Sequence, residues 1–254
     1  MKKIVLKISY DGTQYSGWQR QDNAIGIQEV IEKNLEKICG EKIVLKAAGR
    51  TDAGVHAEAQ IADFMTNSTI PGKKIKYPLN DFLPDDIRII SSNDIDIDFS
   101  SRFDALYKHY RYTLYTDESI SAMKNRYITV YTYPLDIKKM IEASKFMIGN
   151  LDYKSYEGKF SQMTTSVRRI IDIKIIRDGK YIYFDIFGEA FLKNMVRIMV
   201  GTLLNVGRNI MTFDELRKTF EVPDRTKTGV TMPAKGLTMM KIYYDKKYSE
   251  IIDN

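Results

Sequence analysis

The residues with the clearest chemical potential in this chain of 254 residues lie in a segment rich in glycine and alanine, residues 47–57. Two glycines there flank Arg50 and Asp52, and small residues let another backbone or a ligand come close to the chain. A carboxylate held in such a loop can act as a nucleophile or as a base. An aspartate beside glycine is also typical of a turn or a helix cap, so the segment alone leaves both interpretations open.

A second unusual charge is Arg197, which lies in an otherwise apolar stretch that predicts one helix over residues 190–206. On that helix Lys193 and Arg197 would be four residues apart and form a narrow polar stripe. A guanidinium on a mainly buried helix needs a carboxylate, a phosphate or carbonyl groups to offset its loss of water. Two interpretations follow: a structural ion pair within the core, or a pair with Asp52 that keeps the Asp52 carboxylate ionised.

Aromatic and basic residues alternate over residues 108–112, which predicts a strand with Tyr110 and Tyr112 on one face. An aromatic ring beside a basic side chain is suited to stacking an unpaired base, although packing is the more common role of a tyrosine. Other basic residues could contact a polyanion, each of them being more often a solvated surface charge: Arg20, Lys73, Lys74, Arg102, Arg168 and Arg169.

The supply of ligands excludes several kinds of site. Two histidines, His56 and His109, and the single cysteine, Cys39, are too few for a tetrahedral zinc site, so we expect no metal. A lone cysteine also indicates a reducing compartment. The chain shows neither a signal-peptide core near its start nor a run of eighteen apolar residues, so we expect a cytoplasmic protein outside the membrane.

The charge of the chain is unevenly distributed. The formal net charge is +6, of which residues 1–103 carry −1 and residues 104–254 carry +7. A positive balance weakly favours a polyanionic partner such as nucleic acid. Apolar residues make up 44% and charged residues 28%, which is typical of globular proteins and excludes collagen-like, disordered and disulfide-scaffold classes.

The hydrophobic patterns predict two α+β subdomains, residues 1–103 and 104–254. Each is expected to be a mostly antiparallel sheet with helices on one face, and joining the sheets side by side would leave a cleft between the halves. The first subdomain would carry the Asp52 loop and the second Tyr110 and Arg197.

Local signals place several elements within these subdomains. Gly12 is expected to adopt a positive φ in the turn after the first strand, and Gly40 to end a helix that begins near Ile27. Residues 95–99 alternate as an edge strand. Asp178 and Gly179 predict the turn of a hairpin between residues 167–176 and 180–187.

Several segments together resemble the tRNA pseudouridine synthase A family, over nearly the whole chain. The most specific is residues 49–57, which contains the Arg50–Thr51–Asp52 sequence. The others follow in family order: residues 10–21, 79–87, 102–105, 108–112, 191–197 and 233–237. The departures, at His109 and over residues 230–232, do not fall on positions that match the family's catalytic residues.

The resemblance implies a fold of two ferredoxin-like halves and the isomerisation of uridine to pseudouridine at positions 38, 39 and 40 of tRNA, without a cofactor and by a homodimer. Asp52 matches the family's catalytic aspartate, Tyr110 the tyrosine that stacks on the target uracil, and Arg197 the arginine paired with that aspartate. Arg50 matches the arginine that helps to extrude the base, and Leu237 an apolar contact of the pocket. Candidate RNA contacts are Arg20, Arg102, Lys193, Arg168 and Arg169.

Three other functions compete with this one. A pseudouridine synthase with a different RNA target site would have the same active-site residues. A non-catalytic RNA-binding homologue would be expected to lack Asp52 or Arg197, and both are present. An unrelated enzyme that uses these two residues on a small anion would bind its ligand without the steep salt dependence that phosphate contacts give.

Overall fold

The computed structural model describes residues 1–159 and 164–253 and divides the chain into two compact units. The first unit comprises residues 1–107 and 239–254, and the second comprises residues 108–238. The division therefore differs from the expected 1–103 and 104–254, because the chain returns to the first unit at its C-terminal end.

The first unit is built on a sheet in which β1 (Lys2–Tyr10) lies between β4 (Ile87–Ile95) and β3 (His56–Thr66). β10 (Leu237–Tyr243) follows β3, and it belongs to this unit from Met239 onward. β1 is antiparallel to both of its neighbours. A short strand, β2 (Lys46–Ala47), pairs with β3. The even-numbered residues of β1 from Ile4 to Tyr10 are buried, as the alternating pattern predicts.

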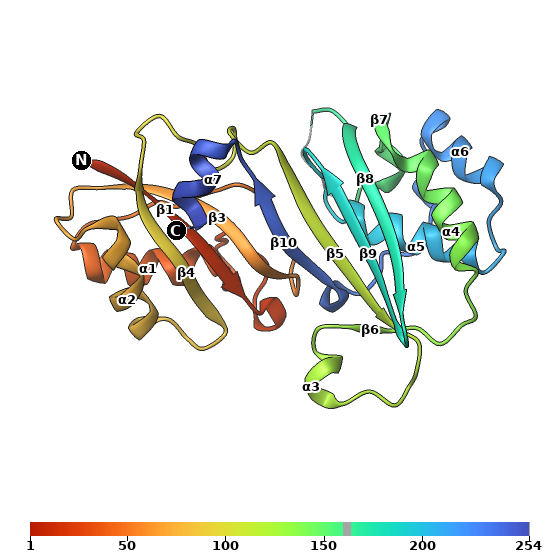
Figure 1. Ribbon diagram of the computed structural model, residues 1–254, viewed down its shortest axis with the longest axis horizontal. Coiled ribbons are helices and arrows are strands. Elements are labelled where there is room, and N and C mark those ends of the chain that lie inside the picture. The colour runs from red at the N-terminus through yellow and green to blue at the C-terminus, as the bar shows by residue number, and fades with distance from the viewer. Residues whose placement is uncertain (160–163, 254) are drawn as a thin grey trace. The chain divides into compact units, whose positions relative to one another are not determined.

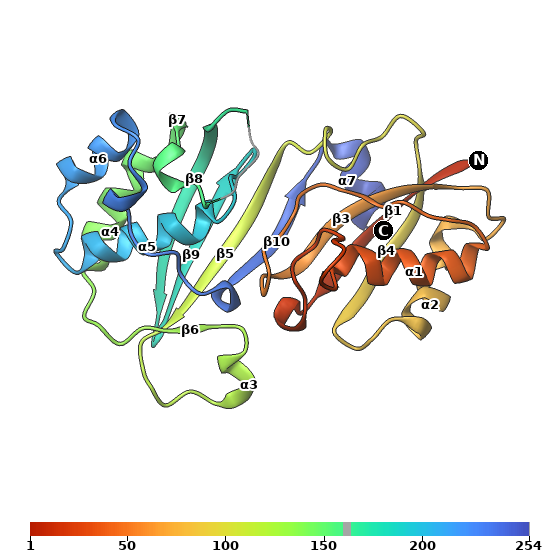
Figure 2. The same ribbon diagram turned by 180° about the vertical axis from the view of Figure 1, so that it is seen from behind.

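Helices cover both faces of this sheet. The helices α1 (Ile27–Cys39) and α2 (Gly72–Phe82) lie on one face, and α7 (Lys246–Asp253) lies on the other (Figures 1 and 2). α1 buries Ile27, Ile31 and Leu35 and ends as predicted at Gly40, whose φ is 70°. α7 was not expected, and it explains why Val5, on the opposite face of β1 from Ile4, is only 1% exposed.

The second unit is built on an antiparallel sheet in the order β5 (Tyr107–Tyr115), β9 (Tyr181–Gly188), β8 (Val167–Asp178) and β7 (Gly149–Asp152). β6 (Thr129–Val130) pairs with β5 in parallel. The hairpin of β8 and β9 turns at Gly179, whose φ is 56°, as predicted.

The helices α4 (Ile137–Ser144), α5 (Met195–Gly207) and α6 (Phe213–Glu221) lie on one face of this sheet (Figures 1 and 2), and α3 (Ala122–Asn125) lies in the long connection from β5. α5 is buried along most of its length, in agreement with its apolar sequence. Single 3-10 turns cover Gly12–Gln14, Lys145–Met147, Lys154–Tyr156, Arg225–Lys227 and Ala234–Gly236.

The α+β class with mostly antiparallel pairing is thus confirmed, while three local predictions are wrong. Residues 96–99 are not a strand; the strand is β4, which ends at Ile95. The φ of Gly12 is not positive, and Gly17 has the positive φ of 90° instead. The helix expected over residues 190–206 begins only at Met195, because Asn194 takes a left-handed conformation with a φ of 60°.

Candidate active site

Asp52 lies in the loop that joins β2 to β3, and this loop is fixed on both sides by hydrogen bonds. On the side before Asp52, the buried Gln60 of β3 donates to the Gly49 carbonyl oxygen at 2.8 Å. Next to Asp52, the Tyr10 hydroxyl shares a 2.8 Å hydrogen bond with Thr51 Oγ1, and the Trp18 amide donates to the Thr51 carbonyl oxygen at 3.1 Å. The backbone around Asp52 is therefore held rigidly, while its side chain stays half-exposed.

The segment 10–21 forms the wall against which this loop packs, and its glycines permit the close approach. A Cβ on Gly17 would lie 2.5 Å from the Thr51 carbonyl oxygen, and a Cβ on Gly12 would lie 2.0 Å from that of Val55. Gly54 donates its amide to the Tyr15 carbonyl oxygen at 3.3 Å. Gly12 is thus required by close packing and not by a positive φ, and the two sequence motifs form one structure.

The side chains of Arg50 and Asp52 differ in their exposure to solvent. Arg50 is exposed, Thr51 between them is only 7% exposed, and Asp52 is half-buried. The loop therefore presents an exposed cation close in sequence to a carboxylate on a fixed backbone. Such a pair can contact an extended polyanion and act on one atom of it.

Tyr110 lies in the second unit, at the centre of β5, on the face that the helices cover. Its ring is 7% exposed and packs edge-on against Phe191, with ring centroids 5.1 Å apart. Tyr112 lies on the same face, as predicted, and is fully buried with its hydroxyl donating to the Pro233 carbonyl oxygen at 2.8 Å. Burial raises the pKa of the Tyr112 hydroxyl, which therefore remains neutral.

The opposite face of β5 carries a charged cluster that fixes this strand to β9. Arg111 donates to both carboxylate oxygens of Asp185 at 2.7 and 2.8 Å, and His109 Nε2 lies 2.7 Å from Asp185 Oδ1. Burial opposes the ionisation of Asp185, but the hydrogen bonds and the charge of Arg111 outweigh it and lower the pKa of Asp185 to about 2. His109 and Arg111 thus flank Tyr110 in sequence and hold its strand in register.

Arg197 lies in the first turn of α5 and is half-buried. Its Nε donates to the Met232 carbonyl oxygen at 2.6 Å, and its Nη1 donates to Asn194 Oδ1 at 2.8 Å. Two neutral acceptors therefore orient the guanidinium from within the second unit. The stripe predicted from Lys193 and Arg197 is wrong, because Lys193 precedes the helix and is exposed.

Leu237 begins β10 and also belongs to the second unit. It is 5% exposed and follows the turn Ala234–Gly236. A Cβ on Gly236 would lie 2.6 Å from the Tyr112 ring, so this turn packs tightly against β5. Asp52 and Arg50 thus belong to one unit, and Tyr110, Arg197 and Leu237 to the other.

The basic residues predicted to contact RNA occupy different environments. Arg102 and Lys193 are exposed. Arg20 lies 3.3 Å from Glu32, and Arg169 lies 3.2 Å from Glu189, so each has an acidic neighbour. Arg168 is only 6% exposed, and its Nη1 donates to the carbonyl oxygens of Thr165 and Val167. Burial lowers the pKa of Arg168 and favours a structural role for its side chain.

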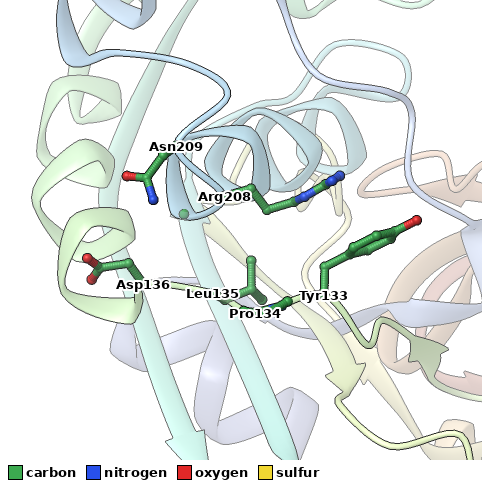
Figure 3. Close-up of a pocket in the computed structure, with 7 residues that line it drawn as sticks. Tyr133, Pro134, Leu135, Asp136, Arg208 and Asn209 are labelled. Carbon is green, nitrogen blue, oxygen red and sulfur yellow. The ribbon is translucent and has the colours of Figure 1, made fainter.

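Other features of the described residues lie apart from these positions. Within residues 1–159 and 164–253 no group of three or more potential metal ligands comes together. No helix among them is long and apolar enough to cross a membrane. Figure 3 shows a surface hollow between the end of α5 and the start of α4, which is lined by Tyr133, Pro134, Leu135, Asp136, Gly207, Arg208 and Asn209. None of these is a predicted site residue.

The sequence reasoning missed the residues that support the site. The contribution of Gln60, Trp18 and Phe191 depends on long-range contacts that no local pattern predicts. The resemblance offered one signal, since residues 10–21 and 49–57 are both motifs, and two motifs rich in glycine are candidates for packing against each other.

Comparison with known proteins assigns the family. The tRNA pseudouridine synthase family matches residues 7–104 and 143–245. The chain is 42% identical to tRNA pseudouridine synthase A of Acetivibrio thermocellus, and the match covers 96% of this chain and 100% of that one. It is 41% identical to the protein of the same name from Clostridium acetobutylicum, with the same coverage. A chain that aligns along its length with these relatives, and that carries the Arg50–Asp52 loop on a fixed backbone, belongs to the tRNA pseudouridine synthase family.

Proposed function

We propose that this chain isomerises uridine to pseudouridine at positions 38–40 in the anticodon arm of tRNA. The observation that carries the proposal is the Asp52 loop, which holds a half-exposed carboxylate on a backbone fixed by Gln60, Trp18 and Gly17, in a chain of this family. A carboxylate on a fixed backbone is the group that the reaction requires.

The reaction breaks the bond between C1′ and N1 of uridine, turns the uracil, and joins C1′ to C5. No atom is gained from outside, and the hydrogen at C5 is replaced by one at N1. Asp52 can attack C1′, add to C6 of the base, or take the proton from C2′. All three routes need the ionised carboxylate.

The other residues divide the remaining work. Tyr110 stacks on the uracil while it is detached, Leu237 contacts the same base, and Arg197 is the counter-ion of Asp52. Arg50 helps to extrude the target nucleotide, which costs a few kcal/mol of lost stacking and pairing. Stacking on an aromatic ring contributes about 1–3 kcal/mol per base, so Tyr110 can offset much of this cost.

Replacement of the carboxylate tests the proposal most directly. Asp52→Asn should reduce pseudouridine formation by at least about a thousandfold, because the amide neither attacks carbon nor accepts a proton. The affinity for tRNA should change little, since the shape of the side chain is retained. Single-turnover assays on unmodified tRNA, with a filter-binding measurement alongside, check both expectations.

The result that contradicts this assignment is substantial turnover by the Asp52→Asn enzyme. Asp22→Asn is a matched control, since Asp22 is an exposed aspartate of the same unit and should keep full activity. Mapping pseudouridine in tRNA from cells that lack the gene, before and after its restoration, identifies the modified positions. Loss at another RNA site alone would favour a related synthase with a different target.

We also propose that the chain acts as a homodimer, so that one tRNA contacts both subunits. The resemblance to the tRNA pseudouridine synthase A family supports this assembly. Native mass spectrometry and sedimentation of the full chain should give about twice the mass of 29.4 kDa. A monomer at micromolar concentration, active at the same specific rate, would contradict it.

A further inference from the structure

The turn that leads from β4 to β5 displays an aromatic ring and a cation that the catalytic roles above leave unused. Phe103 is 81% exposed, and the guanidinium carbon of Arg102 lies 5.3 Å from the centre of its ring. Single exposed apolar side chains are common and by themselves indicate nothing. What distinguishes this pair is how firmly the structure holds the turn beneath it.

Hydrogen bonds fix the backbone of this turn at nearly every residue. Ser100 donates its amide to Asp104 Oδ2 at 2.8 Å, and Asp104 returns its amide to the Ser100 carbonyl oxygen at 3.0 Å. The fully buried Ser101 donates its amide to Asp63 Oδ1 at 2.9 Å and accepts a hydrogen bond from Tyr244 at its carbonyl oxygen. The backbone that carries Arg102 and Phe103 is therefore fixed, and both side chains are exposed to solvent. Binding a ligand to them would require little further ordering of the backbone, so the entropic cost of binding would be low.

The turn is hydrogen-bonded to β2 and β3, the two strands that the Asp52 loop connects. Ser101 Oγ donates to the Lys46 carbonyl oxygen at 2.6 Å, and Lys46 pairs with Asp63 across β2 and β3. Those strands continue into the Asp52 loop at Ala47 and His56. Asp63 lies about seven residues along β3 from His56, which is roughly 23 Å at 3.3 Å per residue. A short stretch of an RNA strand spans that distance.

The charge of the turn fits the same partner. Among the described residues no carboxylate pairs with the guanidinium of Arg102, which is exposed and free to contact a phosphate. An open ring for stacking beside an unpaired arginine for the backbone is the combination that holds an unpaired or terminal base of RNA.

We propose that Arg102 and Phe103 form a second nucleotide-binding site of the first unit, in which the Phe103 ring stacks on a base of the tRNA outside the target nucleotide and Arg102 contacts a neighbouring phosphate. The site rests on the proposed function for its partner and adds a contact beyond the catalytic pocket. It anchors the RNA on the unit that carries Asp52.

Substitutions separate the two contributions. Phe103→Ala should raise the Kd for tRNA at least about fivefold, Phe103→Leu should behave like alanine, and Phe103→Tyr should restore binding, because only a ring stacks. Arg102→Ala should reduce the slope of log Kd against log salt by about 0.7–0.9, the share of one phosphate, whereas Phe103→Ala should leave that slope unchanged.

Phe82→Ala is the matched control. Phe82 is an exposed phenylalanine of the same unit, 57% exposed with Lys37 over its ring, and it stands at the end of α2. Thermal unfolding of every variant establishes that the fold is intact. A Kd for Phe103→Ala equal to that of Phe82→Ala, or wild-type binding by Phe103→Leu, would overturn the site.

A photoreactive benzoylphenylalanine in place of Phe103 identifies the base. Crosslinking to one or two tRNA positions other than the modified uridine supports the proposal, and diffuse or absent crosslinking opposes it. The outcome is separable from that of the proposed function. A wild-type chain that forms no pseudouridine refutes the function, whereas an active wild type with an unaffected Phe103→Ala refutes only this site.

Discussion

At the scale of single residues, the charged cluster on the opposite face of β5 from Tyr110 shows how the fold fixes the orientation of that tyrosine. Asp185 receives two hydrogen bonds from Arg111 and lies against His109, so β5 and β9 cannot slip past each other without leaving a buried charge unpaired. A shift of one residue would turn Tyr110 to the other face of the sheet. The cluster therefore fixes which face the tyrosine occupies.

Asp185→Asn should lower the free energy of unfolding at pH 7 by about 2 kcal/mol, the usual value for hydrogen bonds to a charged group. The pKa of Asp185 in the folded state, about 2, lies below its unfolded value of 3.8. The stabilisation is thus fully present above about pH 4 and is lost as the pH falls toward 2. Urea unfolding of both proteins at pH 7 and pH 3 measures the difference. A deficit that does not shrink at pH 3 would contradict the role of ionisation.

At the scale of elements, the Asp52 loop depends on the backbone of residues 10–21. Gly17→Ala should destabilise the protein by about 2–4 kcal/mol and reduce turnover more than tRNA binding, because its Cβ would lie 2.5 Å from the Thr51 carbonyl oxygen and displace the loop. Gly40→Ala is the control: its φ is 70°, but nothing lies within 4 Å, so it should cost about 1 kcal/mol and leave turnover unchanged. Chemical denaturation and single-turnover assays of the two variants test this prediction. Equal turnover rates for Gly17→Ala and Gly40→Ala would contradict the dependence of the Asp52 loop on Gly17.

The elements that the sequence patterns predicted are those with local determinants. α1 has its apolar spacing and Gly40, and the β8–β9 hairpin has Asp178 and Gly179. β4 differs from the predicted strand over residues 95–99, and its buried residues Ser91, Ser92 and Asn93 are polar, so apolar alternation does not mark them. Their side chains donate to carbonyl oxygens of Ile252, Gly72 and Ile251, so the preceding helix α2 and the distant helix α7 satisfy the polar groups of this strand. No local pattern contains that information.

The candidate site divides in the same way. Asp52 and Arg50 stand out by motif, and Tyr110 by alternation along β5, because these signals are local. The start of α5 depends on a left-handed Asn194 whose Oδ1 accepts from Arg197, a contact that apolar spacing does not predict. The burial of Arg168, next to the exposed Arg169 on β8, likewise depends on which face of the sheet the helices cover.

At the scale of the whole molecule, the uneven charge sets how the protein meets a polyanion. If Arg20, Arg102, Lys193 and Arg169 each contact one phosphate, the slope of log Kd for tRNA against log salt should be about 3 to 4. Affinity would then fall about 60- to 250-fold between 50 and 200 mM KCl. Lys193→Ala should reduce the slope by the share of one phosphate contact, about 0.7–0.9. Lys33→Ala should leave the slope unchanged, because the Lys33 ammonium already lies 2.5 Å from Glu29. Binding that is insensitive to salt would instead indicate an enzyme acting on a small anion, since a single charge pair releases few counterions.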